Sequence, residues 1–193
     1  VIIGNAMSRG NPAVEYVLNK GLPYVSGPQW LADHVLQGRW VMAVAGTHGK
    51  TTTSALLTHL LKGSVACRAF IGGILVGEGS NVLSDPNAEW TVVEADEFDR
   101  SFLHLHPNHA VITSTDPDHL DIYGDAEAFI TSFQTFAKGV TGQVFMATGA
   151  HLPGPHVALH KLLRRLHAYT CTCMHTCTYM HTCIHAYMHT CIH

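Results

Sequence analysis

The chain has 193 residues, of which 47% are hydrophobic and 13% are charged, and its formal net charge at pH 7 is −3. This composition favours a buried core over most of the length and excludes a largely disordered chain. The small negative charge and the absence of a run of Lys and Arg argue against nucleic acid as a partner. No apolar stretch reaches the roughly 18 residues that a membrane-spanning helix needs, so no membrane contact is expected.

The first 38 residues alternate between predicted strands and helices. The stretch GNPAVEYVLNKG predicts a helix with Asn11 as its cap, Pro12 at its first position and Gly21 just past its end. LPYVSG predicts a short strand, and GPQWLADHVLQ predicts a second helix. This alternation is typical of a parallel sheet.

The same rhythm continues to about residue 150. RWVMAVAG is a continuous apolar run of the kind that is buried on both faces of a parallel sheet. The next helix is predicted over residues 51–62, with Leu56, Leu57, Leu60 and Leu61 on one apolar face. The remaining predictions are strands at 90–95 and 109–114, a helix capped by Asp125, and a last strand in QVFMAT. The fold class predicted from this order is α/β with a parallel sheet.

The junction between the apolar run and the helix reads GTHGKTTT, residues 46–53. A strand, a glycine-bearing turn and a helix start place backbone N–H groups around an anion, and Lys50 adds a positive charge. In the general phosphate-binding loop, four residues separate a first glycine from the Gly-Lys pair. Here positions 44 and 45 are Val44 and Ala45, so the loop is a variant with its glycine at Gly46. A simple strand–helix turn is the alternative, but the strand–loop–helix context favours phosphate.

Two further residues stand where strand ends meet the predicted ligand edge of the sheet. Glu94 supplies the hard oxygen ligands that Mg²⁺ prefers. His119 is less clear, because Mg²⁺ generally prefers oxygen, and by itself it reads as a loop histidine. Nearby acidic residues could support such a site indirectly or merely be solvated, and solvation is favoured for most of Asp96, Glu97, Asp99, Asp116, Asp118 and Asp121.

The motif GTHGKTTT and the stretch VVEADEFDRSFLHLHPNHAVITSTDPDHLDIYGD, residues 92–125, resemble the Mur ligase family of peptidoglycan precursor ligases. The second stretch is similar to the central domain of members that add L-alanine. Residues 4–36 are similar to the end of the N-terminal domain of members that attach a preformed tripeptide. The resemblance covers roughly residues 1–140 and implies a central domain of the P-loop type, preceded by the end of a Rossmann-like domain.

The resemblance also implies ligands and residue roles. The substrates would be UDP-N-acetylmuramate and either L-alanine or the tripeptide, joined through an acyl phosphate, with ATP and Mg²⁺ as cofactors. Lys50, Glu94 and His119 would be the catalytic residues, and Thr51, Glu94 and His119 would bind the metal. The ATP phosphates would be surrounded by Gly46, Thr47, His48, Gly49, Lys50, Thr51 and Thr52.

The expected organisation is the end of the UDP-sugar-binding domain at 1–38, an incomplete ATP-binding domain at 39–150 and an unrelated tail at 151–193. From His167 the tail is low-complexity, and its residue alternation indicates a translated dinucleotide repeat rather than a zinc site. Five of the 6 cysteines fall in this tail, so the body indicates a reducing, cytoplasmic protein. The start without Met indicates a truncated chain. The resemblance lacks the beginning of the family's first domain and the whole of its third domain, which implies an inactive fragment of a ligase. A non-catalytic nucleotide-binding module and a translated gene fragment without function are the alternatives.

Overall fold

The computed structural model describes the chain except residues 5–6, 8, 119, 148–149, 153–156 and 159–193. The predicted low-complexity segment from His167 and most of the predicted tail therefore lie outside the described residues. The elements, in chain order, are β1 (Ile2–Ile3), α1 (Pro12–Asn19), β2 (Val25–Ser26), α2 (Gly27–Leu31), the π-helical turn η1 (Ala32–Leu36), β3 (Trp40–Ala45), α3 (Lys50–Lys62), β4 (Cys67–Leu75), β5 (Ser80–Leu83), β6 (Trp90–Glu94), the 3₁₀ helix η2 (Phe98–His104), β7 (His109–Ile112), α4 (Leu120–Tyr123), α5 (Ala126–Lys138), β8 (Val144–Met146) and β9 (Val157–Ala158).

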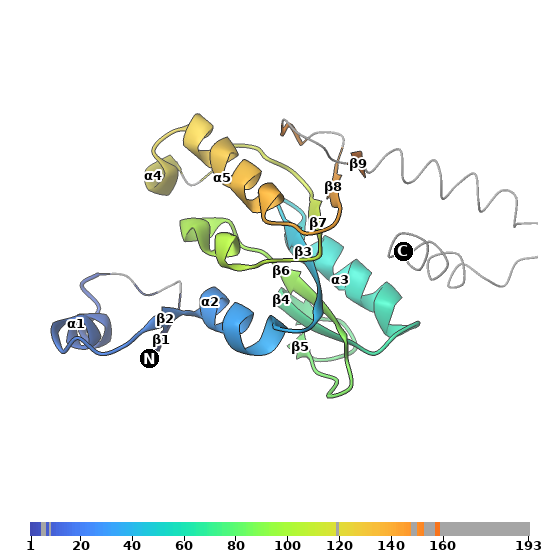
Figure 1. The fold of residues 1–193 in the computed structure, drawn as a ribbon, viewed down its shortest axis with the longest axis horizontal. Coiled ribbons are helices and arrows are strands. Elements are labelled where there is room, and N and C mark those ends of the chain that lie inside the picture. The colour runs from blue at the N-terminus through green and yellow to red at the C-terminus, as the bar shows by residue number, and fades with distance from the viewer. Residues whose placement is uncertain (5–6, 8, 119, 148–149, 153–156, 159–193) are drawn as a thin grey trace, which may run out of the picture.

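A seven-stranded sheet in the order β5-β4-β6-β3-β7-β8-β9 forms the centre of the described structure (Figure 1). Its neighbouring strands run parallel except β4 and β5, which pair antiparallel. The central strand β3 pairs with β6 on one side and with β7 on the other. Because these three strands are parallel, the segments that follow them leave from the same edge, where ligands bind in α/β sheets. The predicted α/β class is confirmed.

The two faces of the sheet pack against different helices. Along β3, Val41, Ala43 and Ala45 belong to the larger apolar cluster, whereas Met42 points into the smaller one, as the two-residue period of a strand requires. Helices α3 and α5 accordingly lie on opposite sides of the sheet in Figure 1. The larger cluster contains four fully or almost fully buried aromatic rings from η2 and α5, namely Phe102, Phe129, Phe133 and Phe136.

Both predicted helix caps are confirmed. The Asn11 side chain accepts a hydrogen bond from the Ala13 N–H at 3.0 Å, and Pro12 is the first residue of α1. The Asp125 side chain accepts one from the Ala128 N–H at 2.7 Å at the start of α5. The predicted strands also form, each shorter than predicted, and the second helix divides into α2 and η1.

Residues 63–89 carried no predicted element, yet they form β4 and β5. Glycine weakens a strand and tends to mark close approach of backbone, so Gly72 and Gly73 obscure the pattern of β4. The structure forms this strand because β4 pairs with the buried strand β6. Tertiary pairing therefore overrides the local preference.

The predicted apolar face of α3 is only partly right. Leu61 is buried with 5% of its surface exposed and Leu57 packs half-buried against the smaller cluster, but Leu56 is 59% exposed. The positions of α3 that are buried are Ser54, Thr58 and Leu61, which follow the three- and four-residue spacing of one helix face. The small side chains of Ser54 and Thr58 allow the helix to approach the sheet closely, so the rotation of α3 about its axis is set by packing rather than by its leucines.

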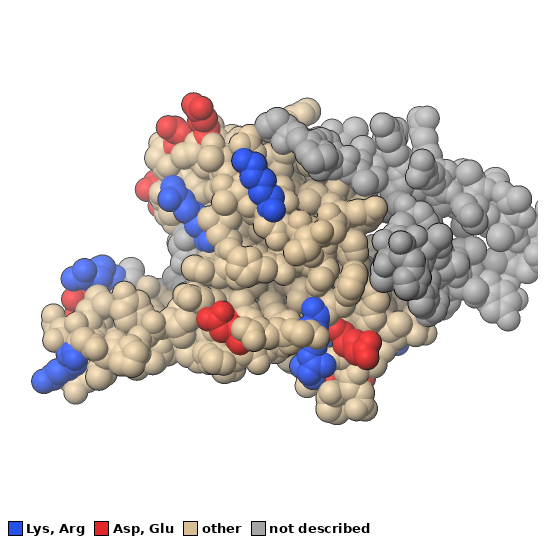
Figure 2. All heavy atoms as spheres, in the orientation of Figure 1, with Lys and Arg blue, Asp and Glu red and all other residues tan. Residues whose placement is uncertain are grey.

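Charged side chains of both signs are scattered over the face of the described structure in Figure 2. None of the helices in the described part of the chain has the length and apolar character to cross a membrane.

The different burial of Leu56 and Leu61 leads to a direct test of the rotation of α3. Leu61→Ala should lower the free energy of unfolding by about 2–5 kcal/mol, because it leaves a cavity in the smaller cluster. Leu56→Ala makes the same chemical change at an exposed site of the same helix and should change the free energy of unfolding by less than about 0.5 kcal/mol. Urea unfolding measures both, and equal losses would contradict the observed rotation.

Candidate functional site

Two glycines build the turn between β3 and α3. Gly46 has a φ of 133° and Gly49 a φ of 81°, both in the region that residues with a side chain avoid. Gly49 is the cap of α3, so Lys50 and Thr51 are the first two residues of this 13-residue helix. The first N–H groups of a helix lack partners within it, and the helix dipole adds partial positive charge there. The turn therefore has the local structure of an anion-binding site.

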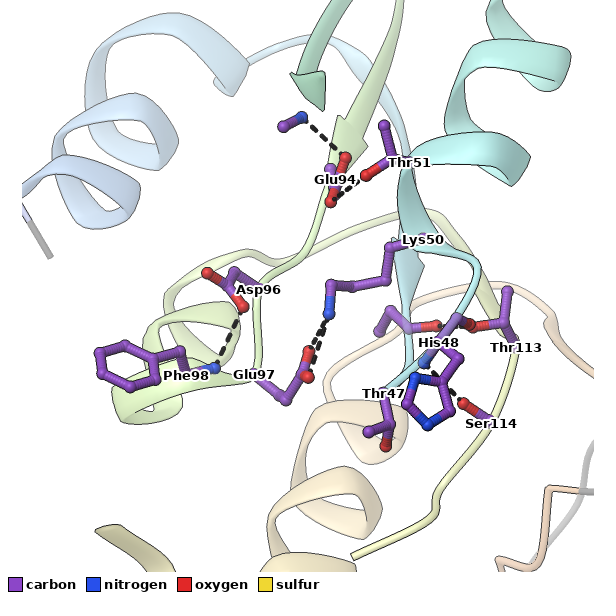
Figure 3. A network of polar contacts seen from close by, with 12 residues as sticks. Thr47, His48, Lys50, Thr51, Glu94, Asp96, Glu97, Phe98, Thr113 and Ser114 are labelled. Atoms are coloured by element: carbon purple, nitrogen blue, oxygen red, sulfur yellow. Dashed lines mark hydrogen bonds and ion pairs between the residues drawn. The ribbon is translucent and has the colours of Figure 1, made fainter. Parts of the chain in front are cut away.

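The segment after β7 holds the turn in place (Figure 3). The Thr113 hydroxyl lies 2.5 Å from the His48 carbonyl oxygen. The His48 N–H donates to Ser114 Oγ at 2.8 Å, and the Thr47 hydroxyl donates to the Asp116 carbonyl at 2.7 Å. The Thr47 N–H also points to the Ser114 carbonyl, at 3.4 Å. An anion in the turn would therefore compete with Ser114 for the amides of Thr47 and His48.

Thr51 and Glu94 come together at the same edge. The Thr51 hydroxyl donates to Glu94 Oε1 at 3.0 Å. The other carboxylate oxygen, Oε2, accepts from the Gly72 N–H of β4 at 2.7 Å. Both oxygens of Glu94 are thus held, one by the helix and one by the neighbouring strand (Figure 3).

The donor set fits a magnesium ion. Mg²⁺ takes oxygen ligands in octahedral geometry at about 2.1 Å, so two adjacent ligand oxygens lie about 3.0 Å apart. The Thr51 and Glu94 oxygens are 3.0 Å apart. His119, the third predicted metal ligand, lies outside the described residues. Among the described residues, no group of three His, Cys, Asp or Glu side chains could hold a metal.

Lys50 is paired with a buried carboxylate. Its Nζ lies 3.0 Å from Glu97 Oε1 and 2.8 Å from Oε2, and Figure 3 shows the lysine chain extended towards Glu97. The side chain of Glu97 is only 1% exposed and that of Lys50 is 15% exposed. The backbone carbonyl of Glu97 also accepts a hydrogen bond from the Tyr123 hydroxyl. The predicted phosphate-binding lysine therefore has a buried partner, contrary to the favoured solvated role of Glu97.

Four other residues named in the sequence prediction are exposed, namely Thr52, Asp116, Asp118 and Asp121. Thr52 lies exposed in the first turn of α3, and Asp121 is exposed in α4. Asp96 accepts a hydrogen bond from the Phe98 N–H at 3.2 Å, which fixes the start of η2.

Two glycines of β4 also belong to the site, although no sequence prediction included them. A Cβ atom at Gly72 would meet Glu94 Oε1 at 2.9 Å, and one at Gly73 would meet Thr51 Cγ2 at 2.8 Å. The Gly-Gly pair thus leaves space for the two candidate metal ligands. The available signal was a glycine pair within an apolar stretch, which often marks close approach of other groups.

Gly46→Ala should be strongly destabilising. A Cβ atom there would lie 2.2 Å from Thr113 Oγ1 and 2.8 Å from the Ser114 backbone nitrogen. Gly77 is a matched control, because it also has positive φ, 92°, but its Cβ would meet nothing within 4 Å. We expect about 1 kcal/mol of lost stability for Gly77→Ala from backbone strain and at least about 3 kcal/mol for Gly46→Ala. Urea unfolding measures the difference, and similar losses would contradict the close contact at Gly46.

Known proteins are similar to this chain in sequence and in fold. Residues 44–151 match the Mur ligase middle domain. The UDP-N-acetylmuramate–L-alanyl-γ-D-glutamyl-meso-2,6-diaminoheptandioate ligase of Haemophilus influenzae is 39% identical over 157 residues, which cover 78% of this chain and 35% of that ligase. The UDP-N-acetylmuramate–L-alanine ligase of Parabacteroides distasonis is 62% identical over 98 residues, covering 50% of this chain and 21% of that ligase.

A solved structure agrees with these relatives. The crystal structure of UDP-N-acetylmuramate:L-alanyl-γ-D-glutamyl-meso-diaminopimelate ligase from Neisseria meningitides superposes with a TM-score of 0.67 at 37% identity, covering 85% of this chain and 54% of that one. The chain spans about a third of the length of the first curated relatives that it matches, 35% and 33%. The middle-domain match extends over more than half of the chain. The chain belongs to the Mur ligase family.

Proposed function

We propose that residues 39–150 are the ATP-binding part of a peptidoglycan precursor ligase. The reaction joins the carboxylate of UDP-N-acetylmuramate to an amine and converts ATP to ADP and phosphate. One observation carries this proposal: Lys50 and Thr51 open a helix behind a double-glycine turn, and Glu94 lies 3.0 Å from the Thr51 hydroxyl. These are the groups that a magnesium-bound triphosphate needs, in one place.

Each residue has a proposed role. The turn 46–49 and the start of α3 hold the phosphates by backbone N–H groups, and Lys50 offsets their negative charge. Thr51 and Glu94 supply oxygen ligands to Mg²⁺, with His119 as the further ligand that the family resemblance implies. Bound there, Mg²⁺ would stabilise the charge that develops during phosphoryl transfer. Thr52 remains in the proposed phosphate contact because it lies exposed in the first turn of α3.

The chemistry requires little from the protein beyond position and charge. The sugar carboxylate attacks the terminal phosphorus of ATP, and the bond from that phosphorus to the ADP oxygen breaks. The amine then attacks the acyl phosphate, releases phosphate and loses a proton. Neither step needs a covalent bond to the protein, so alignment of the reactants and charge stabilisation account for the rate.

The amine substrate has two candidates, L-alanine and the tripeptide. The Haemophilus influenzae and Parabacteroides distasonis relatives carry names that specify the tripeptide and L-alanine, respectively. We assign the reaction to the cytoplasm, the compartment indicated by the position of the cysteines in the sequence. The division into a sugar-binding end at 1–38, an ATP-binding part at 39–150 and a tail at 151–193 is likewise our proposal.

Lys50→Met should weaken the binding of ATP in the presence of Mg²⁺ by about 10- to 100-fold, because charge-assisted contacts to phosphate are lost. Lys62→Met removes the same charge at the other end of α3 and should leave the affinity unchanged. Isothermal titration calorimetry on the 193-residue protein measures both. Equal affinities of wild type and Lys50→Met, with both proteins folded by circular dichroism, would contradict the phosphate role of Lys50.

A chimera tests the ligase function. Residues 44–151 would replace the matching segment of the Parabacteroides distasonis ligase, and phosphate release would be followed with UDP-N-acetylmuramate and either amine. We expect turnover by the chimera, its loss on Lys50→Met, and none by the 193-residue chain alone, because further surfaces must orient the other two substrates. A folded chimera that binds ATP without turnover supports the non-catalytic alternative. One that does not bind ATP supports the gene-fragment alternative.

A further inference from the structure

We propose that Glu97 is the counter-ion of Lys50 in the nucleotide-free protein and that it makes the loop select the magnesium-bound triphosphate over the metal-free one. The proposal rests on the proposed ATP binding and adds a residue to it. Glu97 acts through Lys50 and the local charge, so it is a positioning residue.

The contact between the two side chains limits what Lys50 can do. An ammonium group has three protons. Glu97 accepts from Lys50 Nζ with both carboxylate oxygens, at 3.0 Å and 2.8 Å. This arrangement engages two of the three protons, so Lys50 must loosen its hold on Glu97 to make more than one contact with phosphate.

Glu97 is held in this position from its backbone. It follows β6 at the ligand edge of the sheet, and its carbonyl oxygen accepts from the Tyr123 hydroxyl and from the Arg100 N–H. Arg100 itself has a φ of 63°, which is strained for a residue with a side chain, and its guanidinium lies 5.2 Å from the centre of the Tyr123 ring. These contacts fix the backbone of Glu97, and the burial of its side chain, which is 1% exposed, leaves the carboxylate little room to move when Lys50 moves towards a ligand.

The charges at this edge explain the selection. Lys50 brings one positive charge, whereas Glu94 and Glu97 bring one negative charge each, so these three side chains carry a net charge of −1. A metal-free triphosphate meets this negative charge directly. Thr51 and Glu94 would hold Mg²⁺ as oxygen ligands, and its positive charge would offset this repulsion. Burial strengthens the effect, because solvent screens a carboxylate with 1% exposure poorly.

Glu97→Gln tests the proposal. It keeps the size of the side chain and removes its charge, so Lys50 becomes available and the repulsion falls. We expect the Kd for ATP in EDTA to fall by about tenfold and that for ATP with Mg²⁺ to fall by about threefold, because the metal lowers the charge of the ligand. Glu78→Gln removes a carboxylate paired with Lys62 at the far end of α3 and should leave both constants unchanged.

Several results would overturn the proposal. If Glu97→Gln weakens both forms of ATP, Glu97 only supports the loop. If Glu97→Gln changes neither Kd, the charge of Glu97 does not make the loop select between the two forms of ATP. A wild-type protein that binds no ATP under either condition overturns the proposed function as well, whereas wild-type binding with an unchanged Kd ratio in Glu97→Gln overturns only this inference.

The ion pair can also be tested without nucleotide. Lys50→Met leaves the buried carboxylate of Glu97 unpaired, so the urea midpoint should fall. The double variant Lys50→Met/Glu97→Gln removes both charges, and its midpoint should lie above that of Lys50→Met alone. A double variant that is less stable than Lys50→Met would show that the charge of Glu97 is not unfavourable without Lys50, and it would overturn the counter-ion role even where Glu97→Gln alone fails to fold.

Discussion

The close contact between the turn after β3 and the segment after β7 is the constraint on which the candidate site depends. Gly46 lies so near Thr113 and Ser114 that a single added carbon would overlap them. This contact fixes where α3 begins, and the beginning of α3 places Lys50 and Thr51 at the ligand edge. The parallel register of β3 with β6 then brings Glu94 to Thr51, since Val44 of β3 pairs with Glu94. One tight turn thus positions residues that lie more than 40 apart in sequence.

Much of this arrangement follows from local patterns in the sequence. Asn11 and Asp125 are predictable caps because their side chains satisfy the free N–H groups of the next few residues. The position of Lys50 was predictable to within one residue, because an apolar run, glycines and a hydroxyl-rich helix start have few structural alternatives. The rotation of α3 was not predictable, because its leucines suggested one face while the packing of Ser54 and Thr58 selects another.

The residues that were missed act only through tertiary contacts. Glu97 stands in an acidic stretch that reads as solvated, and nothing local indicates that its side chain is buried against Lys50. Gly72 and Gly73 have no role along their own strand. Their importance comes from Glu94 and Thr51, which approach from β6 and α3. Such roles follow from the pairing of β4 with β6, and that pairing was absent from the predicted elements.

The burial of the Lys50–Glu97 pair needs a reason beyond stability. Removing two charges from water costs several kcal/mol, and a well-packed apolar pair is often at least as stable. A lysine with the proposed phosphate-binding role cannot be replaced in this way, and without a nucleotide its partly buried charge needs a partner. Glu97 supplies that partner at the same edge as Glu94. In our proposal this arrangement stabilises the nucleotide-free loop and adds negative charge beside the proposed metal ligands, so the same carboxylate would both pair with Lys50 and make ATP binding depend on Mg²⁺.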